Sequence, residues 1–390
     1  MSVIPRHRIE VKLESLLPAL FLHREKNIRL FKDGLEGYFN RKVILLQSGR
    51  AALYYLLRGL PQTTVIVPAY TCKVVPEAVL LAGKRVVYVD IDPGTLNMDP
   101  DDLERKIEPQ SVILATHQFG IPCDMGKIAA LARDHHCVLL EDCAAAFGSR
   151  VEGQLVGTSG LAGIFSFEFT KPLSAGRGGF ILFNDGDLHK KVEQLTEQEL
   201  RPPPALFAAK VMVTLFLHKL ITVPFWYGLF IRMFYRRFGF SLDRGEIRPS
   251  HDSLYRYTLS SLEATLGLFN LKRIEDILQR RQEIACQYQR GLEGLEGIGL
   301  PVFPSHSFCS WMRFPVRILQ QDRRDFYLAC LKTGLDLGFT YTYSCSSQCE
   351  NSQWVARQMV NLPMNSNLTE AEVARVIRVV KDVIKAGGSE

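Results

Sequence analysis

The stretch VILLQSGRAALYYLLRGL, residues 43–60, contains the unit from which the fold can be predicted. An apolar run passes through Ser48-Gly49 directly into apolar residues at helical spacing, as a strand followed by a helix would. Comparable apolar runs lie at residues 64–70, 84–91, 111–120 and 137–143, and a helical pattern lies at 125–136. This alternation predicts an α/β domain with a mostly parallel sheet covered by helices on both faces. In such sheets, ligands bind at the carboxyl ends of the strands.

The composition is that of a folded, water-soluble protein and excludes several functional classes. Of the 390 residues, 47% are hydrophobic and 23% are charged, and this length allows two or three domains. The net charge of +6 is spread widely, whereas a nucleic-acid-binding protein needs a clustered basic stripe. The nine cysteines form no Cys-x-x-Cys pair, which favours reduced thiols and predicts no metal site. Because residues 1–17 lack the apolar core of a signal peptide, we expect a cytoplasmic location.

Residues 201–240 differ from the rest of the chain because they are strongly apolar and contain no acidic residue. Lys210, His218-Lys219 and Pro224 interrupt the apolar runs, and neither half reaches the ~20 residues that a membrane-spanning helix needs. One interpretation is a peripheral contact with the inner membrane face, in which basic side chains of a helical pair meet lipid phosphates. These side chains would be Arg232, Arg236 and Arg237. The alternatives are a helical pair buried in the protein and a dimer interface.

The second half of the chain predicts a linking helix and a smaller domain. Helical spacing over residues 253–295 predicts one long helix that carries the chain out of the first domain. Short strand-like and helical runs then predict an α+β domain, whose last helix has its start and stop signals at Thr369 and Gly387. We therefore predict a large domain over residues 1–250, including the 201–240 segment. The linking helix and the small C-terminal domain would occupy residues 251–390.

Two polar features lie where strands of the first domain end. The helix start at Ser48-Gly49-Arg50 offers backbone N–H groups to an anion such as a phosphate, although many such glycines serve packing alone. Asp142 ends the apolar run of residues 137–143 and is followed by small residues. A carboxylate in that position is often a cap or a surface group. The small neighbours also leave space for a protonated ring nitrogen that the aspartate would keep charged.

Lys171 lies in the nearly uncharged run FSFEFTKPLSAGRGGF, residues 165–180. A lone lysine in a strand-like run can extend its amine to water over apolar surface. A desolvated amine, in contrast, has a lowered pKa and can form a Schiff base with a carbonyl group. Ser166 precedes the lysine, and three glycines follow it that allow a tight turn, namely Gly176, Gly178 and Gly179. A phosphate cradle, a strand-end aspartate and a lysine followed by glycines together predict a site for pyridoxal 5'-phosphate.

The chain also resembles a known family, the DegT/DnrJ/EryC1/StrS sugar aminotransferases. The resemblance is carried by VPAYTCKVVPEAVLLAGKRVVYVDIDPGTLNMDPDDLERKI (67–107), THQFGIPCDMGKIAALARDH (116–135) and VNLPMNSNLTEAEVARVI (360–377). It implies the pyridoxal-phosphate-dependent transferase fold of type I, active as a homodimer. It also implies transfer of an amino group, usually from glutamate, to a keto sugar attached to a nucleotide.

The resemblance assigns roles to individual residues. Lys171 would be the Schiff-base lysine and the proton shuttle, and its presence excludes the dehydratase branch of the family, which lacks this lysine. Asp142 would pair with the pyridinium nitrogen of the cofactor. Ser166 would hydrogen-bond the phosphate, and the cradle would be completed by Ser48, Gly49 and Arg50.

Several positions depart from the family pattern. Cys72 stands where an aromatic residue usually stacks on the cofactor ring, with Tyr70 nearby as a candidate substitute. Ala145 stands where His, Gln or Ser is common. Arg256 aligns with an Asn that reaches the phosphate from the partner subunit, and an Arg there could still bind phosphate. The segment FTYTYSCSS (339–347) lacks the usual His-Tyr pattern, so the cofactor site is kept while the substrate site is altered.

These observations predict a ping-pong aminotransferase that acts on a nucleotide-linked keto sugar for surface polysaccharide or glycoconjugate biosynthesis. One alternative keeps the chemistry but acts at the membrane on a lipid-linked or otherwise hydrophobic ketone. Another is a non-catalytic scaffold that uses residues 201–240 as a partner surface. A scaffold has no physical reason to keep Lys171, Asp142 and Ser166 together, which favours an enzyme.

Overall fold

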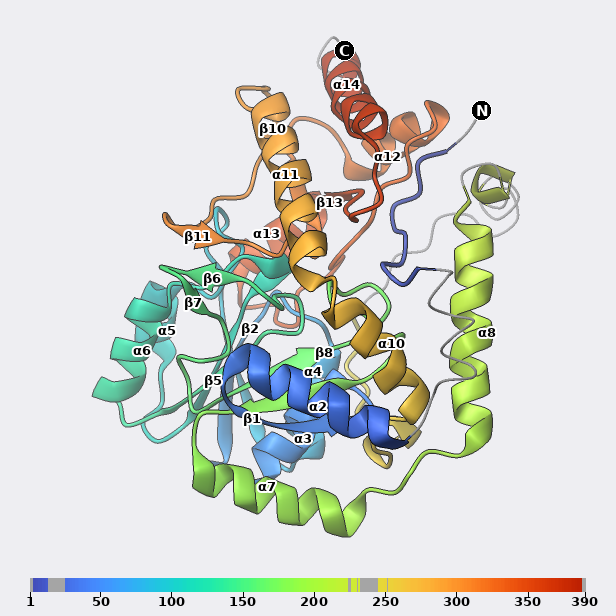
Figure 1. Cartoon of the computed structure of the whole chain (residues 1–390). Helices are drawn as coiled ribbons and strands as arrows, with labels where there is room; N and C mark the ends of the chain where they lie inside the picture. Colours follow the sequence, from blue (N-terminus) through green and yellow to red (C-terminus); the bar gives the residue numbers. More distant parts are fainter. Residues whose placement is uncertain are drawn as a thin grey trace.

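The computed structural model describes residues 3–12, 25–223, 226–229, 231, 245–250 and 252–387. Within this part of the chain, a seven-stranded sheet occupies the lower half of Figure 1 and a smaller sheet lies above it. The large sheet consists of β1 (Lys42–Leu46), β2 (Thr64–Pro68), β3 (Arg85–Val89), β4 (Val112–Thr116), β5 (Val138–Asp142), β8 (Ala162–Ser166) and β9 (Gly179–Phe183).

The large sheet has the strand order β1-β9-β8-β5-β4-β2-β3. β9 runs antiparallel to both of its neighbours, because the chain returns from β8 to β9 directly through residues 167–178. The remaining neighbouring pairs are parallel. The mostly parallel sheet predicted from the sequence is therefore confirmed, and the loop that carries Lys171 connects the neighbouring strands β8 and β9.

Helices cover both faces of this sheet, as predicted. Alternation along β2 shows the reason, because Val65 and Val67 pack on one face while Ile66 packs on the other. The first face carries α3 (Gly49–Arg58), α4 (Val74–Leu81) and α7 (Gly186–Glu199). The second face carries α5 (Pro100–Lys106) and α6 (Met125–Asp134), with α2 (Glu25–Phe39) and α10 (Ser261–Leu271) beside them.

The prediction of one long helix over residues 253–295 is wrong. The structure has a 3-10 turn η2 (Ser253–Tyr255), then α10, then α11 (Ile274–Leu292), and Figure 1 shows the last two at an angle. Ser260 and Glu263 form a capping box that begins α10 afresh. Arg273, with φ −118° and ψ 9°, leaves the helical path before α11 begins.

The smaller sheet is built from the second half of the chain. It consists of β10 (Ile298–Gly299), β12 (Phe314–Ile318) and β13 (Met359–Leu362). Its helices are α11, α12 (Arg323–Lys332), α13 (Glu350–Gln358) and α14 (Glu370–Gly387). The hydroxyl of Thr369 accepts a hydrogen bond of 3.2 Å from the Glu372 N–H, so the predicted start of the last helix is confirmed.

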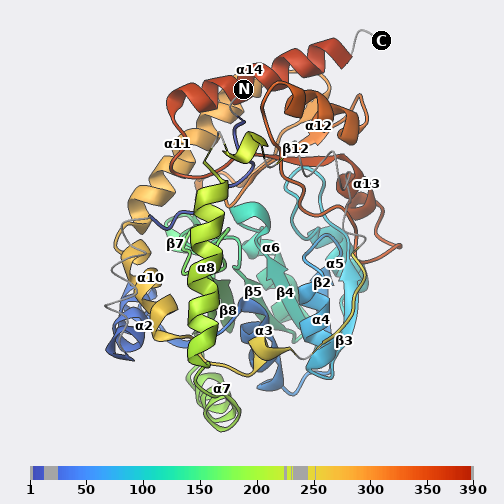
Figure 2. The same ribbon diagram turned by 90° about the vertical axis from the view of Figure 1, so that its right-hand side faces the viewer.

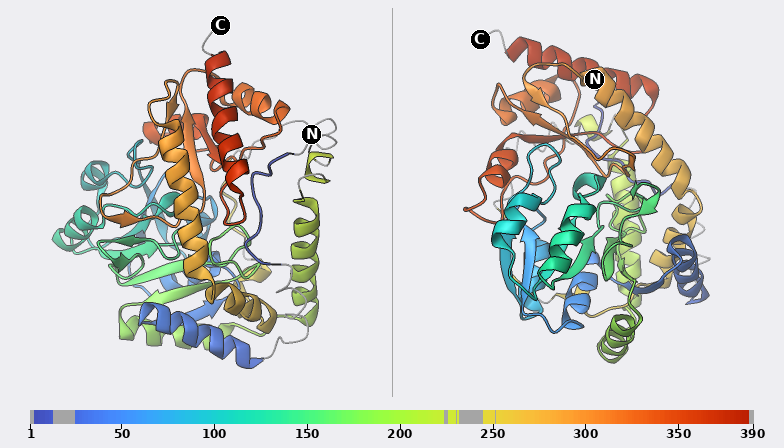
Figure 3. Two further views of the ribbon diagram at one scale, coloured as in Figure 1. Left: turned by 45° about the horizontal axis from the view of Figure 1, so that its top comes forward. Right: turned by 90° about the vertical axis from the view of Figure 1, so that its left-hand side faces the viewer.

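Several contacts join the halves of the chain, and two of them involve β-type pairing. Ile4 packs in the hydrophobic cluster of the smaller sheet and pairs with Leu335. A third sheet combines β6 (Arg150–Val151) and β7 (Gln154–Leu155) with β11 (Ser307–Phe308). Figure 3 shows the two parts stacked, with α11 extending along the smaller one. The division of the chain at residue 250 stays a prediction.

Helix α8 (Ala205–Ile221) stands alongside the rest of the fold (Figures 1 and 2). Val211, Met212 and Leu215 on one side of it are buried in the cluster that also holds α2 and α10. Of the predicted partner helix, residues 226–229 and 231 are described and are helical, whereas Pro224 and the arginines at 232, 236 and 237 lie outside the described residues. None of the helices within the described ranges is long and apolar enough to cross a membrane.

Candidate active site

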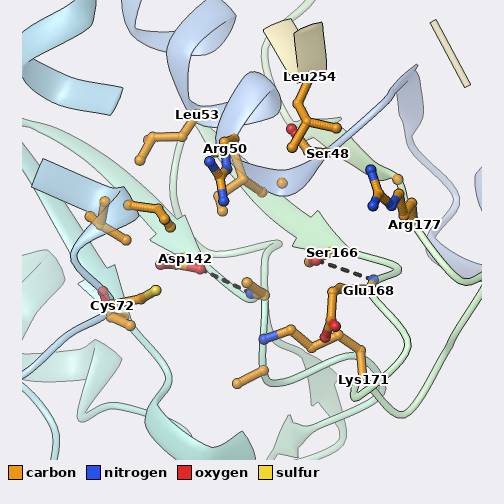
Figure 4. A pocket seen from close by; sticks show the side chains of 18 of the residues that line it. Ser48, Arg50, Leu53, Cys72, Asp142, Ser166, Glu168, Lys171, Arg177 and Leu254 are labelled. Carbon is orange, nitrogen blue, oxygen red and sulfur yellow. Dashed lines mark hydrogen bonds between the residues drawn. The ribbon is translucent and has the colours of Figure 1, made fainter. Parts of the chain in front are cut away.

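The sequence-predicted site residues converge on one cavity of about 440 Å³. It lies where β5 and β8 end and α3 begins (Figure 4). Its walls include Ser48, Gly49, Arg50, Cys72, Asp142, Ala145, Ser166 and Lys171. Arg256 is not part of the wall: its side chain is exposed, two residues beyond Leu254, which does line the cavity.

The start of α3 forms a cradle that lies close against Ser166. Ser48 caps the helix by accepting a 3.1 Å hydrogen bond from the Ala51 N–H. A Cβ on Gly49 would lie only 3.1 Å from Ser166 Cβ and 3.5 Å from Ser166 Oγ. The first N–H groups of a helix lack intrahelical partners and carry partial positive charge. The cradle therefore presents bare backbone donors and a serine hydroxyl to an anion.

Two arginines add positive charge near this cradle. Arg50 approaches Asp252 at 3.5 Å, a loose contact that leaves most of its guanidinium free for another acceptor. Arg177 lines the same cavity, and its guanidinium lies 5.4 Å from the ring centroid of Phe207. A phosphate group in the cradle would thus meet backbone donors on one side and guanidinium groups on the other.

Asp142 is buried at the end of β5 and faces the cavity (Figure 4). Among the described residues, its side chain accepts one hydrogen bond, from the Ala144 N–H to Oδ1 at 3.0 Å. Burial raises the pKa of this carboxyl, while the charges of Lys171 and His117 oppose the rise. A buried carboxylate with spare acceptor capacity is suited to a cationic N–H of a ligand.

Glu141, next to Asp142, has a different environment. Its carboxylate accepts hydrogen bonds from the N–H groups of Gly157, Ser159 and Gly160 at 2.7–2.8 Å. It also contacts His117 Nε2 at 3.0 Å. Burial acts to raise its pKa, but His117 and these backbone donors outweigh burial and hold the pKa below its usual value. Glu141 therefore fixes the loop that follows β5 and does not reach the cavity.

Lys171 lines the cavity and is half-buried, and its environment answers the question raised by the sequence. Its amine lies 3.3 Å from the Met312 sulfur, a weak acceptor. Burial lowers the pKa of Lys171, and the nearby Glu168, Cys72 and Asp142 only partly offset this effect. A lysine that reaches water over apolar surface would keep its charge, so the desolvated, nucleophilic amine is the better interpretation.

The residues around the ring position are small. Cys72 lines the cavity, and burial raises the pKa of its thiol, which favours the neutral form. Ala145 lines it as well. Tyr70 is fully buried and does not replace a stacking ring: its hydroxyl donates to the Thr340 carbonyl at 2.7 Å and accepts from the Tyr341 N–H at 2.9 Å. Tyr70 thus positions Tyr341, which does line the cavity.

Sequence reasoning missed Arg313, whose backbone follows Met312 at the cavity. No hydrogen-bond partner reaches its buried Nε among the described residues, and both side-chain amide atoms of Asn361 are also unpartnered there. A Cβ on Gly338 would lie 3.6 Å from Arg313 Nη1 and 3.7 Å from Asn361 Nδ2, so the two groups meet beside Gly338. Burial lowers the pKa of Arg313, partly offset by Glu168 and Tyr341. Within the described part of the chain, the arrangement is a half-buried guanidinium with an unpartnered Nε beside an unpartnered amide.

Comparisons with known proteins agree with this geometry. A sequence profile of the DegT/DnrJ/EryC1/StrS aminotransferase family matches residues 6–215 and 230–381. The dTDP-4-dehydro-2,3,6-trideoxy-D-glucose 4-aminotransferase of Saccharopolyspora spinosa is 27% identical over 352 residues, 87% of this chain and 84% of that protein. The spore coat polysaccharide biosynthesis protein SpsC of Bacillus subtilis (strain 168) is 24% identical, with 99% of this chain and 96% of that protein covered.

Solved structures extend the likeness to three dimensions. The crystal structure of S. venezuelae DesV in complex with a ketimine intermediate has a TM-score of 0.78 against this chain at 22% identity. The match covers 99% of both chains, so it includes the large sheet, the smaller sheet and α8. The chain therefore has the fold of that protein from end to end.

Proposed function

Because the chain belongs to the DegT/DnrJ/EryC1/StrS aminotransferase family, we propose that it transfers an amino group from an amino acid to a keto sugar, with glutamate as the expected donor. The proposed acceptor is a keto sugar attached to a nucleotide, and the reaction would serve the biosynthesis of a surface polysaccharide or a glycoconjugate. The observation that carries the proposal is the convergence of Lys171, Asp142 and the start of α3 on one cavity. The names of the S. spinosa and B. subtilis relatives support the choice of substrate class.

The residues of the cavity fit pyridoxal 5'-phosphate. At Gly49, where even a Cβ would lie only 3.1 Å from Ser166 Cβ, the cradle offers bare N–H groups and the Ser166 hydroxyl to a phosphate. Asp142 has acceptor capacity for a pyridinium N–H, and Lys171 is the enclosed amine between them. When bound, the cofactor supplies an electron sink for carbanion chemistry. Cys72 and Ala145 would flank its ring.

Each chain residue then has a defined task in the proposed reaction. Ser48, Gly49, Arg50 and Ser166 hold the phosphate and so fix the depth of the ring. Asp142 keeps the ring nitrogen protonated. Lys171, with its lowered pKa, is released as a neutral amine and moves a proton at the substrate carbon. The walls of the cavity exclude water during that step.

We further propose that Arg313 and Asn361 bind the carboxylate of the amino donor. The amine of a donor amino acid would take the place of the Lys171 amine on the cofactor, and the carbon that bears this amine also bears the carboxylate, so a cation near the lysine would meet that carboxylate. Arg313 follows Met312, whose sulfur is 3.3 Å from the Lys171 amine. An unpaired guanidinium and an unpaired amide together offer a carboxylate the donors it needs.

We also propose that the active protein is a homodimer in which Arg256 of the partner subunit contributes to the phosphate site. Support comes from the exposure of the Arg256 side chain and its position two residues from the cavity-lining Leu254. The test mixes two inactive variants, Lys171→Ala and Arg256→Ala, under conditions of subunit exchange. Recovered activity in the mixture supports a shared site, whereas no recovery despite proven exchange contradicts it.

The main proposal is tested by loading the purified protein with pyridoxal phosphate, reducing it with borohydride and mapping the modified peptide. We expect the label on Lys171, and no label in a folded Lys171→Ala variant. Glutamate-dependent amination of nucleotide-linked keto sugars is then measured by mass spectrometry. A protein that binds no cofactor, or that carries the label on another lysine, overturns the proposal.

A further inference from the structure

The outer face of α8 carries several large apolar side chains that are exposed in the described structure. We define this outer face as Val213, Phe216, Leu217 and Leu220, continued beyond the helix by Val223, Trp226 and Leu229. Their exposed fractions range from 44% to 58%. Spacings of three and four residues place the four helical members on one side of α8. Figure 2 shows α8 standing in front of the fold, where this side is not covered by another labelled helix.

The opposite side of α8 is fully used. Val211, Met212 and Leu215 are buried in the core cluster. Two sides of α8 are therefore apolar, and the core cluster covers only the side that carries Val211, Met212 and Leu215. Scattered single apolar side chains on a surface need no explanation, but four exposed on one side of a single helix, with three more in the next nine residues, mark a contact site.

The charges around the strip indicate what contacts it. Residues 201–240 contain six Lys or Arg residues and no Asp or Glu, although at the chain's average of 41 acids in 390 residues the segment would hold about four. Lys210 is exposed at the edge of the strip. A cationic margin beside an apolar strip, with an exposed Trp at its end, matches the headgroup layer of an anionic lipid bilayer.

A second copy of the chain fits less well. A twofold interface brings the same patch of each subunit together, so each basic residue near the axis would meet its own equivalent. With no acidic residue in the segment, nothing local compensates these charges. Anionic lipid supplies that compensation, and it also matches the mixture of aliphatic and Trp side chains.

We propose that the outer face of α8 docks the protein on an anionic phospholipid bilayer as a peripheral contact. The inner face of the same helix touches the wall of the cavity. A Cβ on Gly176 would lie 3.0 Å from Leu215 and 3.1 Å from Val211, and the His218 ring is 5.2 Å from that of Phe169. Gly176 and Phe169 both line the cavity, so the docking helix and the active cavity share a wall. Docking would hold the active cavity at the membrane, next to any lipid-linked intermediate.

The test is flotation of the purified full-length protein with vesicles of phosphatidylcholine, with or without phosphatidylglycerol. We expect binding to the mixed vesicles, weakened by salt. The variant Phe216→Gln/Leu220→Gln should bind roughly tenfold more weakly or worse, because two buried apolar side chains are lost from the contact. The matched control is Leu30→Gln on α2, since Leu30 is 50% exposed as well and should leave vesicle binding unchanged.

The subunit mass of each variant is measured in parallel, and cofactor uptake verifies folding independently of vesicle binding. Lys210→Glu should lower binding to mixed vesicles with little change on phosphatidylcholine alone. The proposal is overturned if the wild-type protein does not float with mixed vesicles, or if Leu30→Gln weakens binding as much as the double variant. It is also overturned if the double variant changes the oligomeric state but not vesicle binding, which would make the strip an interface between copies. Failure of this proposal leaves the aminotransferase assignment intact, because cofactor labelling and amination are measured separately.

Discussion

Replacing Asp142 by Asn tests the proposed chemistry most directly. The side chain of Asp142 accepts one hydrogen bond, from the Ala144 N–H at 3.0 Å, and an amide oxygen can accept the same bond. Burial raises the pKa of Asp142, so its charge at neutral pH costs folding free energy in the cofactor-free protein. We therefore expect Asp142→Asn to fold normally and to be at least as stable as the wild type without cofactor at pH 7.

The effect on rate should be large. With the cofactor present, the carboxylate would face a protonated ring nitrogen inside the cavity, and an amide cannot keep that nitrogen charged. Removing one partner of a buried ion pair costs roughly 3–5 kcal/mol. Because about 1.36 kcal/mol corresponds to a tenfold change in rate, turnover should fall by roughly two to four orders of magnitude.

The assay combines single-turnover reaction with glutamate, followed by absorbance, with urea unfolding of the cofactor-free protein. Glu141→Gln is the matched control, since it makes the same chemical change one residue earlier. Gln at 141 would direct an NH2 group at backbone N–H donors, so we expect a stability loss of roughly 1–3 kcal/mol with turnover per folded molecule preserved. Near-wild-type turnover in Asp142→Asn, or equal rate losses in both variants, would refute the assignment of Asp142.

Three further predictions follow from the same contacts. Gly49→Ala should change the unfolding free energy of the cofactor-free protein by no more than about 1 kcal/mol, because the better helix propensity of Ala offsets the 3.1 Å approach of its Cβ to Ser166 Cβ. The same variant should bind the cofactor at least several-fold more weakly in a fluorescence titration. Arg313→Met should raise the KM for glutamate by roughly tenfold or more, because the loss of a charged hydrogen bond costs roughly 1.5–3 kcal/mol. The KM for the sugar should not change, and equal effects on both substrates would contradict the proposed donor site. The lowered pKa of Glu141 means that its contribution to stability is present above its unfolded pKa of about 4.3 and is lost as the pH falls through its folded value. The gap in unfolding free energy between wild type and Glu141→Gln should therefore shrink from pH 6 to about pH 3 in urea titrations.

The sequence predicted those features that local pattern determines. The strands and the covering helices follow from apolar periodicity, and the cradle follows from Ser48-Gly49-Arg50 at the turn between β1 and α3. The break between α10 and α11 was missed, because the apolar residues keep their helical spacing through Lys272 and Arg273. The backbone nevertheless leaves the helical path at Arg273, after the helix that the capping box at Ser260 begins.

Residues that reach the cavity from far along the chain could not be predicted in this way. Met312 lies 141 positions from Lys171, and no local pattern links the two. Arg313 could have been suspected only as a cation within the apolar run FCSWMRFPVRI, where its burial demands a partner. Tyr341 reaches the cavity because Tyr70 binds the backbone on both sides of the Thr340–Tyr341 bond, a contact between the two halves of the chain.

The two acids that end β5 show how a local rule and the tertiary fold combine at this site. Successive side chains of a strand point to opposite faces, so Glu141 and Asp142 must enter different environments. The register places Glu141 beside Gly163 and Asp142 beside Ile164 of β8, at the carboxyl end of the parallel strands. Glu141 therefore meets the loop at Gly157–Gly160, and its carboxylate accepts hydrogen bonds from N–H groups of that loop. Asp142 instead faces the cavity, and its carboxylate can accept further hydrogen bonds from a ligand. An adjacent acid pair at the end of a buried strand thus supplies one structural and one reactive carboxylate, and the alternation of the strand decides which is which.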